Sequence, residues 1–339
     1  MHPVDALQEI AFWLERDLAP SFKVQAFRTA AAAIAGRSDD DLEARLRSGA
    51  LARTKGVGSR SLEVIGQALE GRVPDYLQAL LDRERETTSE AGAGLLADLR
   101  GDLHCHSEWS DGGTPIALMV EAARTLGREY IALTDHSPNL TVAHGLTAER
   151  LTEQLGVLDD VRADHPDVRV LSGIEVDILE DGTLDQTPAM LDRLDVVVAS
   201  VHSKLRADRR TMTERMLGGI RDPHTNVLGH CTGRLVQGSR GERPQSTFDA
   251  RAVFEACVEH DVAVEINSRP ERQDPPDDLI QLALEVGCLF SIDTDAHAPG
   301  QLDFLRLGAE RAAQNGVPAD RIVTTWPVER LLAWAHPQA

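Results

Sequence analysis

Residues 102–111 read DLHCHSEWSD and place two histidines, His104 and His106, one residue apart. On an extended segment these two imidazoles point to the same side, because side-chain direction alternates along a strand. Both could bind one metal ion, and Asp111 supplies a third candidate ligand a few residues further on. A single His-x-His motif is weak evidence of a metal site, so the interpretation depends on the rest of the chain.

Six further apolar runs end in the same kind of residue. Each run is short, rich in Val, Ile, Leu and Ala, and typical of a strand buried in a parallel sheet. The side chains that follow the runs are Asp135 and His136, Glu175 and Asp177, His202, His230, Glu265 and Asn267, and Asp293, Asp295 and His297. With residues 102–111, the sequence predicts seven strands, each with His, Asp or Glu near its carboxyl end.

Helical patterns separate these strands over residues 101–339. Alternating strands and helices predict a parallel sheet. Side chains at seven strand ends can act together at one site only if the sheet closes on itself, because the strand ends of an open sheet diverge. We therefore expect an α/β fold, a (β/α) barrel with seven strands, whose polar side chains gather at the carboxyl end.

The composition sets broad limits on the protein. The 339 residues indicate one large or two unequal domains. The sequence has neither a long apolar run nor a signal-peptide pattern, so we expect a cytoplasmic protein with no membrane partner. Four cysteines without a CxxC spacing favour reduced thiols. The formal charge of −20 opposes nucleic-acid binding, but bound divalent cations would offset several carboxylates, so charge alone does not discriminate between substrates.

Residues 1–88 predict a separate domain made of helices. Two helices are expected between residues 4 and 36, a third after Ser38, and a fourth that ends near Gly71. The turn Gly56-Val57-Gly58 precedes the fourth helix. Such a turn exposes N–H groups at the positive end of the helix dipole, which suits a phosphate. The alternative is that the glycines only permit a tight turn between packed helices.

Residues 5–88 resemble the small helical lyase-type domain that begins X-family DNA polymerases. Residues 22–35 are similar to its second helix, and Gly56-Val57-Gly58 is similar to its helix-hairpin-helix. The resemblance implies sequence-independent binding of the DNA backbone, here by Lys55, Gly56, Gly58 and Arg60. Val64 stands where lyase-active members carry the Schiff-base lysine, so we expect no deoxyribose-phosphate lyase activity.

Residues 89–100 are expected to be a linker between the helical domain and a second domain at 101–339. Alternating charges give way there to small residues. A bacterial X-family polymerase would carry a nucleotidyl-transfer region with three carboxylates at this place. Because the linker is short, we expect no polymerase activity.

Seven motifs between residues 101 and 330 resemble those of the PHP (polymerase and histidinol phosphatase) family, in the same order. They are HCHSEWSDG, LTDHS, GIEVDI, ASVHS, LGHCTGRL, EINSRPERQD and SIDTDAHAPGQL. The resemblance is strongest to the PHP domain of bacterial X-family polymerases. It implies a distorted (β/α)7 barrel with three divalent metal ions at the carboxyl ends of the strands. Carried over position by position, its ligands are His104, His106, Asp111, His136, Glu175, His202, His230, Asp295 and His297.

This ligand set predicts phosphoester hydrolysis. Mixed imidazole and carboxylate ligands favour Zn, Mn or Fe over Mg or Ca. Ions about 4 Å apart lower the pKa of a bridging water and offset charge on a phosphoryl oxygen. We expect Glu175, Asp295 and His297 to hold the bridging hydroxide that attacks phosphorus. Asp135 and Asp293 lie next to ligands in the sequence and could orient them, although turn or capping roles are open.

The substrate is less constrained than the reaction. Four polar residues just past strands are predicted to hold the substrate phosphate, with surface salt bridges as the alternative: Lys204, Arg234, Asn267 and Arg269. A DNA-processing enzyme would act as a 3′-5′ exonuclease, clean 3′ ends or nick abasic sites. A small-molecule phosphatase for histidinol phosphate or nucleotides would use the helical domain as a lid or dimer contact. A non-catalytic DNA-binding accessory protein is disfavoured by the complete ligand set, and the Gly56-Val57-Gly58 turn favours DNA as the substrate.

Overall fold

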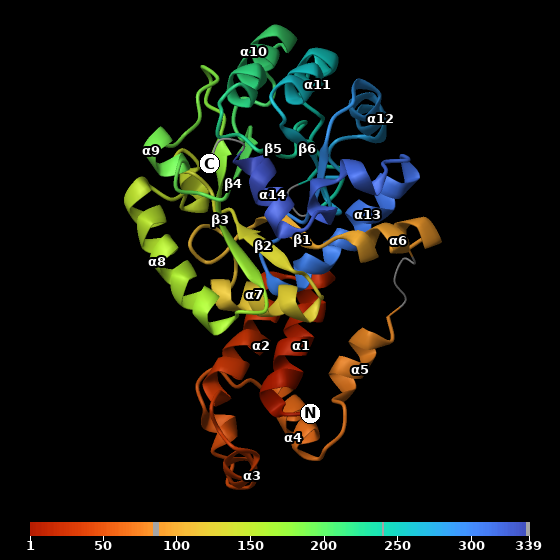
Figure 1. Cartoon of the computed structure of the whole chain (residues 1–339). Coiled ribbons are helices and arrows are strands. Elements are labelled where there is room, and N and C mark those ends of the chain that lie inside the picture. Colours follow the sequence, from red (N-terminus) through yellow and green to blue (C-terminus); the bar gives the residue numbers. More distant parts are fainter. Residues whose placement is uncertain (84–87, 239–240, 337–339) are drawn as a thin grey trace. The chain divides into compact units, whose positions relative to one another are not determined.

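The computed structural model describes residues 1–83, 88–238 and 241–336. The chain divides into two compact units, Met1–Thr87 and Thr88–Ala339, which are considered separately (Figure 1). None of the described helices combines the length and the apolar character that a membrane span requires.

The first unit is helical throughout its regular structure, as predicted. Its helices are α1 (Pro3–Arg16), α2 (Ser21–Ile34), α3 (Asp39–Arg47), the 3-10 turn η1 (Leu51–Arg53), α4 (Ser59–Leu69) and α5 (Asp75–Leu81). The start of α3 is set by Ser38, whose side chain accepts a hydrogen bond from the N–H of Asp41. The fourth α-helix ends two residues before Gly71, close to the predicted position.

Apolar residues at helical spacing build one core in this unit. Leu7 and Ile10 of α1 pack in one buried cluster with Phe27 and Ile34 of α2 and with Val64 of α4. Val64 has no exposed surface. The position at which the resemblance predicted the loss of the Schiff-base lysine is therefore a core position.

The second unit contains the predicted seven-stranded parallel sheet. The strands are β1 (Gly101–Cys105), β2 (Tyr130–Leu133), β3 (Arg169–Asp177), β4 (Val196–Ser200), β5 (Val227–Leu228), β6 (Ala263–Asn267) and β7 (Phe290–Asp293). Each strand pairs in parallel with the next along the chain, in the order β1 to β7. Apart from Arg169, every strand residue is buried, as expected for a parallel sheet covered on both faces.

Helices surround the strands in this unit (Figure 1). They are α6 (Glu90–Asp98), α7 (Ile116–Thr125), α8 (Ala148–Asp164), α9 (Pro188–Leu191), α10 (Arg209–Ile220), α11 (Ala250–Glu259), α12 (Asp277–Val286), α13 (Leu305–Gln314) and α14 (Val328–Ala335). Val197 alternates with Val196 and Val198 along β4 and packs in a different cluster, together with helix residues such as Met216. This alternation separates the layer under the helices from the barrel interior.

Two buried carboxylates connect the first and last strands. The N–H of Leu103 donates to Oδ1 of Asp293 at 2.8 Å, and the hydroxyl of Thr294 donates to Oδ2 of Asp102 at 2.5 Å. Burial raises the pKa of Asp102 to about 6. Burial and the neighbouring Asp102 raise the pKa of Asp293 well above its usual range. The barrel is therefore nearly closed, with side chains bridging β1 and β7 just below the strand ends.

The prediction of a linker at residues 89–100 is wrong, because most of these residues form α6. Ser89 caps this helix by accepting a hydrogen bond from the N–H of Gly92. The small residues that suggested a linker allow α6 to approach α13 closely. A Cβ on Gly92 would lie 2.1 Å from Oε2 and 3.1 Å from Cα of Glu310.

We expect Gly92→Ala to lower the free energy of unfolding by about 1–3 kcal/mol, because the new methyl group would overpack the contact with α13. Gly94→Ala is the matched control on the same helix, since nothing lies within 4 Å of its Cβ position. That control should raise stability by about 0.5–1 kcal/mol through helix propensity. Chemical denaturation of both variants measures the difference, and equal effects would contradict the close packing described.

Candidate metal centre

The nine candidate ligands lie at the carboxyl ends of the barrel strands. His104 is in β1 and Glu175 in β3, and the other seven lie in the segments that follow strands. An unbroken series of nitrogen-to-oxygen contacts between 2.7 and 3.6 Å joins all nine: His104, His106, Asp111, His136, Glu175, His202, His230, Asp295 and His297. Six segments that are distant in the sequence therefore meet at one place.

Glu175 occupies the middle of this cluster. Its Oε1 lies 2.8 Å from Nε2 of His230 and 3.1 Å from Nε2 of His202. Its Oε2 lies 2.7 Å from Nδ1 of His136 and 3.4 Å from Nε2 of His104. Nε2 of His106 also lies 3.6 Å from Oε2, so the two oxygens face different imidazoles and Glu175 would help to hold bound cations.

A second part of the cluster surrounds two aspartates. Oδ1 of Asp111 lies 3.4 Å from Nε2 of His136 and 3.3 Å from Nε2 of His297. Oδ1 of Asp295 lies 3.4 Å from Nε2 of His106. The backbone of Asp295 is left-handed, with φ of 52°, a conformation that costs energy in a residue other than glycine.

The donor atoms fit a metal centre. Three overlapping groups have ligand atoms within 4.8 Å of one another: His106, Asp111, His136 and His297; His104, His106 and Glu175; and His136, Glu175 and His202. Both oxygens of Glu175 and Nε2 of His104, His202 and His230 are buried without a hydrogen bond of good geometry. Such atoms cost about 1–3 kcal/mol each when unpaired, so a bound cation would stabilise them.

The electrostatics also suit a cation. Burial lowers the pKa of His106 to about 3, and His297 and His136 add to this effect, so the imidazole is neutral and can act as a ligand. Burial alone would raise the pKa of Glu175, but His202 and His104 outweigh it and hold that pKa well below its usual range. Burial opposes the charge on Asp295 as well, and Arg272 outweighs it to the same effect. The carboxylates are therefore ionised.

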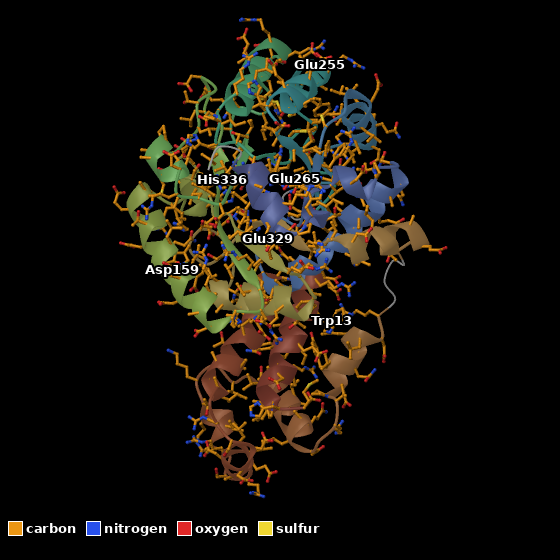
Figure 2. The ribbon with its side chains drawn as sticks, viewed as in Figure 1. Trp13, Asp159, Glu255, Glu265, Glu329 and His336 are labelled. Atoms are coloured by element: carbon orange, nitrogen blue, oxygen red, sulfur yellow. The ribbon has the colours of Figure 1, made fainter. Side chains whose placement is uncertain are left out.

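Two carboxylates that received no role from the sequence hold the histidines in place. Nδ1 of His104 lies 2.6 Å from Oε1 of Glu265, and Nδ1 of His202 lies 2.5 Å from Oδ1 of Asp177. Glu265 lies in β6 and is labelled in Figure 2. Metal-binding histidines usually bond a carboxylate through the other ring nitrogen. The signal was present in the sequence, because both acids follow apolar runs.

Asp135 and Asp293 contact the backbone and loops that carry the ligands. Asp135 accepts hydrogen bonds from the N–H and hydroxyl of Ser107 at 2.8 and 2.7 Å and from the amide of Gln154 at 2.6 Å. It thereby holds the loop between His106 and Asp111. Asp293 holds the backbone of β1 beside His104, as described above.

The four residues predicted to bind phosphate occupy different places. Nη1 of Arg269 donates to the carbonyl of Asp295 at 2.8 Å and lies 2.9 Å from Nδ1 of His297. The amide of Asn267 lies 3.3 Å from Oδ2 of Asp295. Arg234 donates to the carbonyl of Gln273 at 2.9 Å, and Lys204 lines another pocket, with Glu180 and Arg206. Of these four residues, Arg269 and Asn267 contact the cluster.

Arg272 is a further residue that the sequence did not single out. Its guanidinium is buried, and Nε donates to Oδ2 of Asp295 at 2.9 Å. Together with Asn267 and Arg269 it surrounds Asp295 with donors, which keeps that carboxylate oriented toward His106.

The family comparison agrees with this geometry. Residues 102–269 match the family model described as the PHP domain. The barrel of this chain belongs to the PHP family. The predicted resemblance and the barrel fold are therefore confirmed, and the chain is a metal-dependent phosphoesterase.

Two curated relatives of this chain differ in the activities that their names give. The DNA polymerase/3′-5′ exonuclease PolX of Bacillus subtilis is 38% identical over 217 residues, which cover 64% of this chain. This chain spans 37% of the length of that relative. A protein of Vibrio parahaemolyticus named "Probable phosphatase" is 26% identical over 247 residues, covering 67% of this chain and 90% of the relative.

Solved structures include the histidinol phosphate phosphatase of Lactococcus lactis, determined with Zn, L-histidinol and phosphate. It is 19% identical, with a TM-score of 0.48, and the match covers 64% of this chain and 94% of that structure.

We expect Glu265→Gln to weaken metal binding about 10- to 100-fold, because it replaces the carboxylate that orients His104. Competition with a chelator of known affinity, followed by metal analysis, measures the change. Glu255→Gln is the matched control, since Glu255 lies exposed on α11 (Figure 2). Equal metal affinity in both variants would show that Glu265 does not support the centre.

Proposed function

We propose that this protein hydrolyses phosphoester bonds in DNA, as a 3′-5′ exonuclease, a 3′-end-cleaning enzyme or an abasic-site nicking enzyme. The observation that carries the proposal is the presence, in one chain, of the barrel cluster and a helical unit with an open glycine turn. The 38% identity of the barrel to a DNA polymerase/3′-5′ exonuclease supports it.

The glycine turn is built differently at its two glycines. Gly56 has φ of 92°, and a Cβ there would lie 2.8 Å from Cγ2 of Thr29, so local packing explains this glycine. Gly58 precedes α4 without a side-chain cap, and nothing lies within 4 Å of its Cβ position. Packing therefore does not explain Gly58, whereas close approach of a phosphate to the first N–H groups of α4 would.

Exposed basic side chains flank this turn. Lys55 and Arg60 are both exposed, and Arg60 pairs with Glu63 at 2.9 Å. Exposed pairs of this kind contribute little to stability, so Arg60 can exchange Glu63 for a phosphate at small cost. Contacts of this type bind the DNA backbone without reading its sequence.

In the barrel, the nine candidate ligands and two neighbouring polar residues have proposed roles in hydrolysis. Divalent ions bound among the nine ligands would activate a water and offset charge on a phosphoryl oxygen. Glu175, Asp295 and His297 would hold this activated water. Arg269 and Asn267 lie at the edge of the site, where a guanidinium and an amide can donate to phosphate oxygens. Without bound cations, the carboxylates of the site would repel a phosphate, since like charges repel.

A small-molecule phosphatase is the second candidate. The observation that favours it is the Vibrio relative named as a phosphatase, which this chain matches over 90% of that relative's length. A barrel of this kind can therefore form nearly the whole of a protein. In that case the helical unit would have a role other than DNA binding.

A substrate panel separates the two. Purified protein and an Asp295→Asn, His297→Ala double variant are incubated with 3′-recessed, abasic and 3′-phosphate duplexes and with histidinol phosphate, in Mn and in Zn. We expect the protein to cleave at least one duplex and the double variant to lose more than 100-fold in rate, because it lacks two ligands. Equal rates for both proteins would refute the assigned centre.

DNA binding is tested by the salt dependence of affinity. We expect Lys55→Ala and Arg60→Ala each to reduce the slope of log affinity against log salt by about 1, because each removes one phosphate contact. Arg47→Ala is the matched control, an exposed arginine on α3 of the same unit. Absence of measurable binding at low salt would leave the small-molecule phosphatase as the remaining candidate.

A further inference from the structure

We propose that a pocket beside the metal centre binds the nucleobase of the nucleotide whose phosphoester is hydrolysed. We call it the Trp109 pocket. It has a volume of about 410 Å³, and its lining includes Glu108, Trp109, Ser110, Pro138, His144 and Arg150. This inference rests on the proposed function, since it names the chemical group that the substrate carries next to its phosphate.

The pocket is lined by residues that lie next to two candidate ligands in the sequence. Ser110 immediately precedes the ligand Asp111, and Pro138 follows the ligand His136 by two residues. Those two ligands lie 3.4 Å apart, Nε2 to Oδ1. A substrate with its phosphate at the centre therefore places the adjoining group next to this pocket. In a nucleotide, that group is a sugar with its base.

Trp109 provides an aromatic wall. Its side chain is partly buried and packs against two of the hydrophobic core clusters of this unit. The guanidinium carbon of Arg150 lies 6.0 Å from the centre of the Trp109 ring, at the outer limit of a cation–π contact. The indole is thus anchored by core packing, and its contact with Arg150 is loose.

Arg150 brings positive charge and a second flat surface. Its guanidinium donates hydrogen bonds to backbone carbonyls. Nη2 donates to the carbonyl of Trp109 at 2.5 Å, and Nη1 donates to the carbonyls of His144 at 2.5 Å and Gly145 at 3.2 Å. These bonds fix the guanidinium without neutralising its charge. Fixed aromatic and guanidinium planes are the surfaces on which bases stack.

His144 adds a third ring at the rim. Its backbone is left-handed, with φ of 57°, and its side chain is exposed. This turn belongs to the segment that leads from the candidate ligand His136 to α8. Indole, guanidinium and imidazole together match a flat heteroaromatic ring with hydrogen-bonding edges better than an aliphatic alcohol or a bare sugar.

The source of the base is either a DNA terminus or a free nucleotide, and two substrate pairs distinguish them. One pair is an oligonucleotide with a 3′-terminal thymidine and the same strand with a 3′-terminal tetrahydrofuran abasic residue. The other pair is thymidine 5′-phosphate and ribose 5-phosphate. Initial rates yield kcat and KM for each, with p-nitrophenyl phosphate as the reference for metal-centre activity.

We expect a KM about 5- to 100-fold lower for the base-bearing member of at least one pair, the range of a single base–aromatic stack. Trp109→Ala should abolish this preference by raising KM for the base-bearing substrate alone, and Trp109→Phe should retain part of it. Trp334→Phe, on α14, is the tryptophan control and should behave as the unaltered protein. Metal analysis of each variant verifies that the loop between His106 and Asp111 still holds its ions.

The outcomes are separable. A base preference in the nucleotide pair with no cleavage of DNA supports the pocket and refutes the DNA proposal. Cleavage of DNA without a base preference, or with a preference that survives Trp109→Ala, overturns the pocket and leaves the DNA proposal in place. Hydrolysis of p-nitrophenyl phosphate alone overturns both.

Discussion

The structure depends on a buried carboxylate, Glu175, surrounded by imidazoles. An ionised carboxylate in a protein interior is costly unless positive groups compensate it. Here the compensation comes from five histidines on four other segments of the chain, at 2.7 to 3.6 Å. None of these segments could supply its ligand if the strands diverged, so the closed barrel is a requirement of the site.

Closure of the barrel uses the same kind of group. Asp102 and Asp293 bridge β1 and β7 from inside, and Glu265 and Asp177 hold two of the histidines from behind. Buried acids thus form two layers, one that ties the strands together and one that faces the ligands. The ionised carboxylates of the cluster concentrate negative potential at the carboxyl end, where divalent cations would offset it. It also explains in part how a protein of net charge −20 can act on an anionic substrate.

The fold was predictable because its signals are local. Apolar runs of strand length alternate with helical patterns, and the seven predicted strands are the seven observed. The prediction of a linker at residues 89–100 was wrong because a glycine can mark either a linker or a close contact between helices, and the sequence does not distinguish them. At Gly92 the reason is a close contact, because α13 leaves no room for a Cβ. The supports Glu265 and Asp177 were visible as acids at strand ends, yet only the folded chain shows which imidazole each one contacts.

The sequence by itself determined the number and order of the strands, the chemical type of the residues at their ends and the family of the barrel. These follow from periodicity and from motif identity, which depend on neighbours along the chain. Tertiary structure alone decided that Glu175 lies between the imidazoles, that Arg269 and Asn267 reach the centre while Arg234 and Lys204 contact other groups, and that Trp109 lines a pocket beside the ligands. Such facts depend on distances between segments far apart in the chain, and these distances are set by strand register and helix packing.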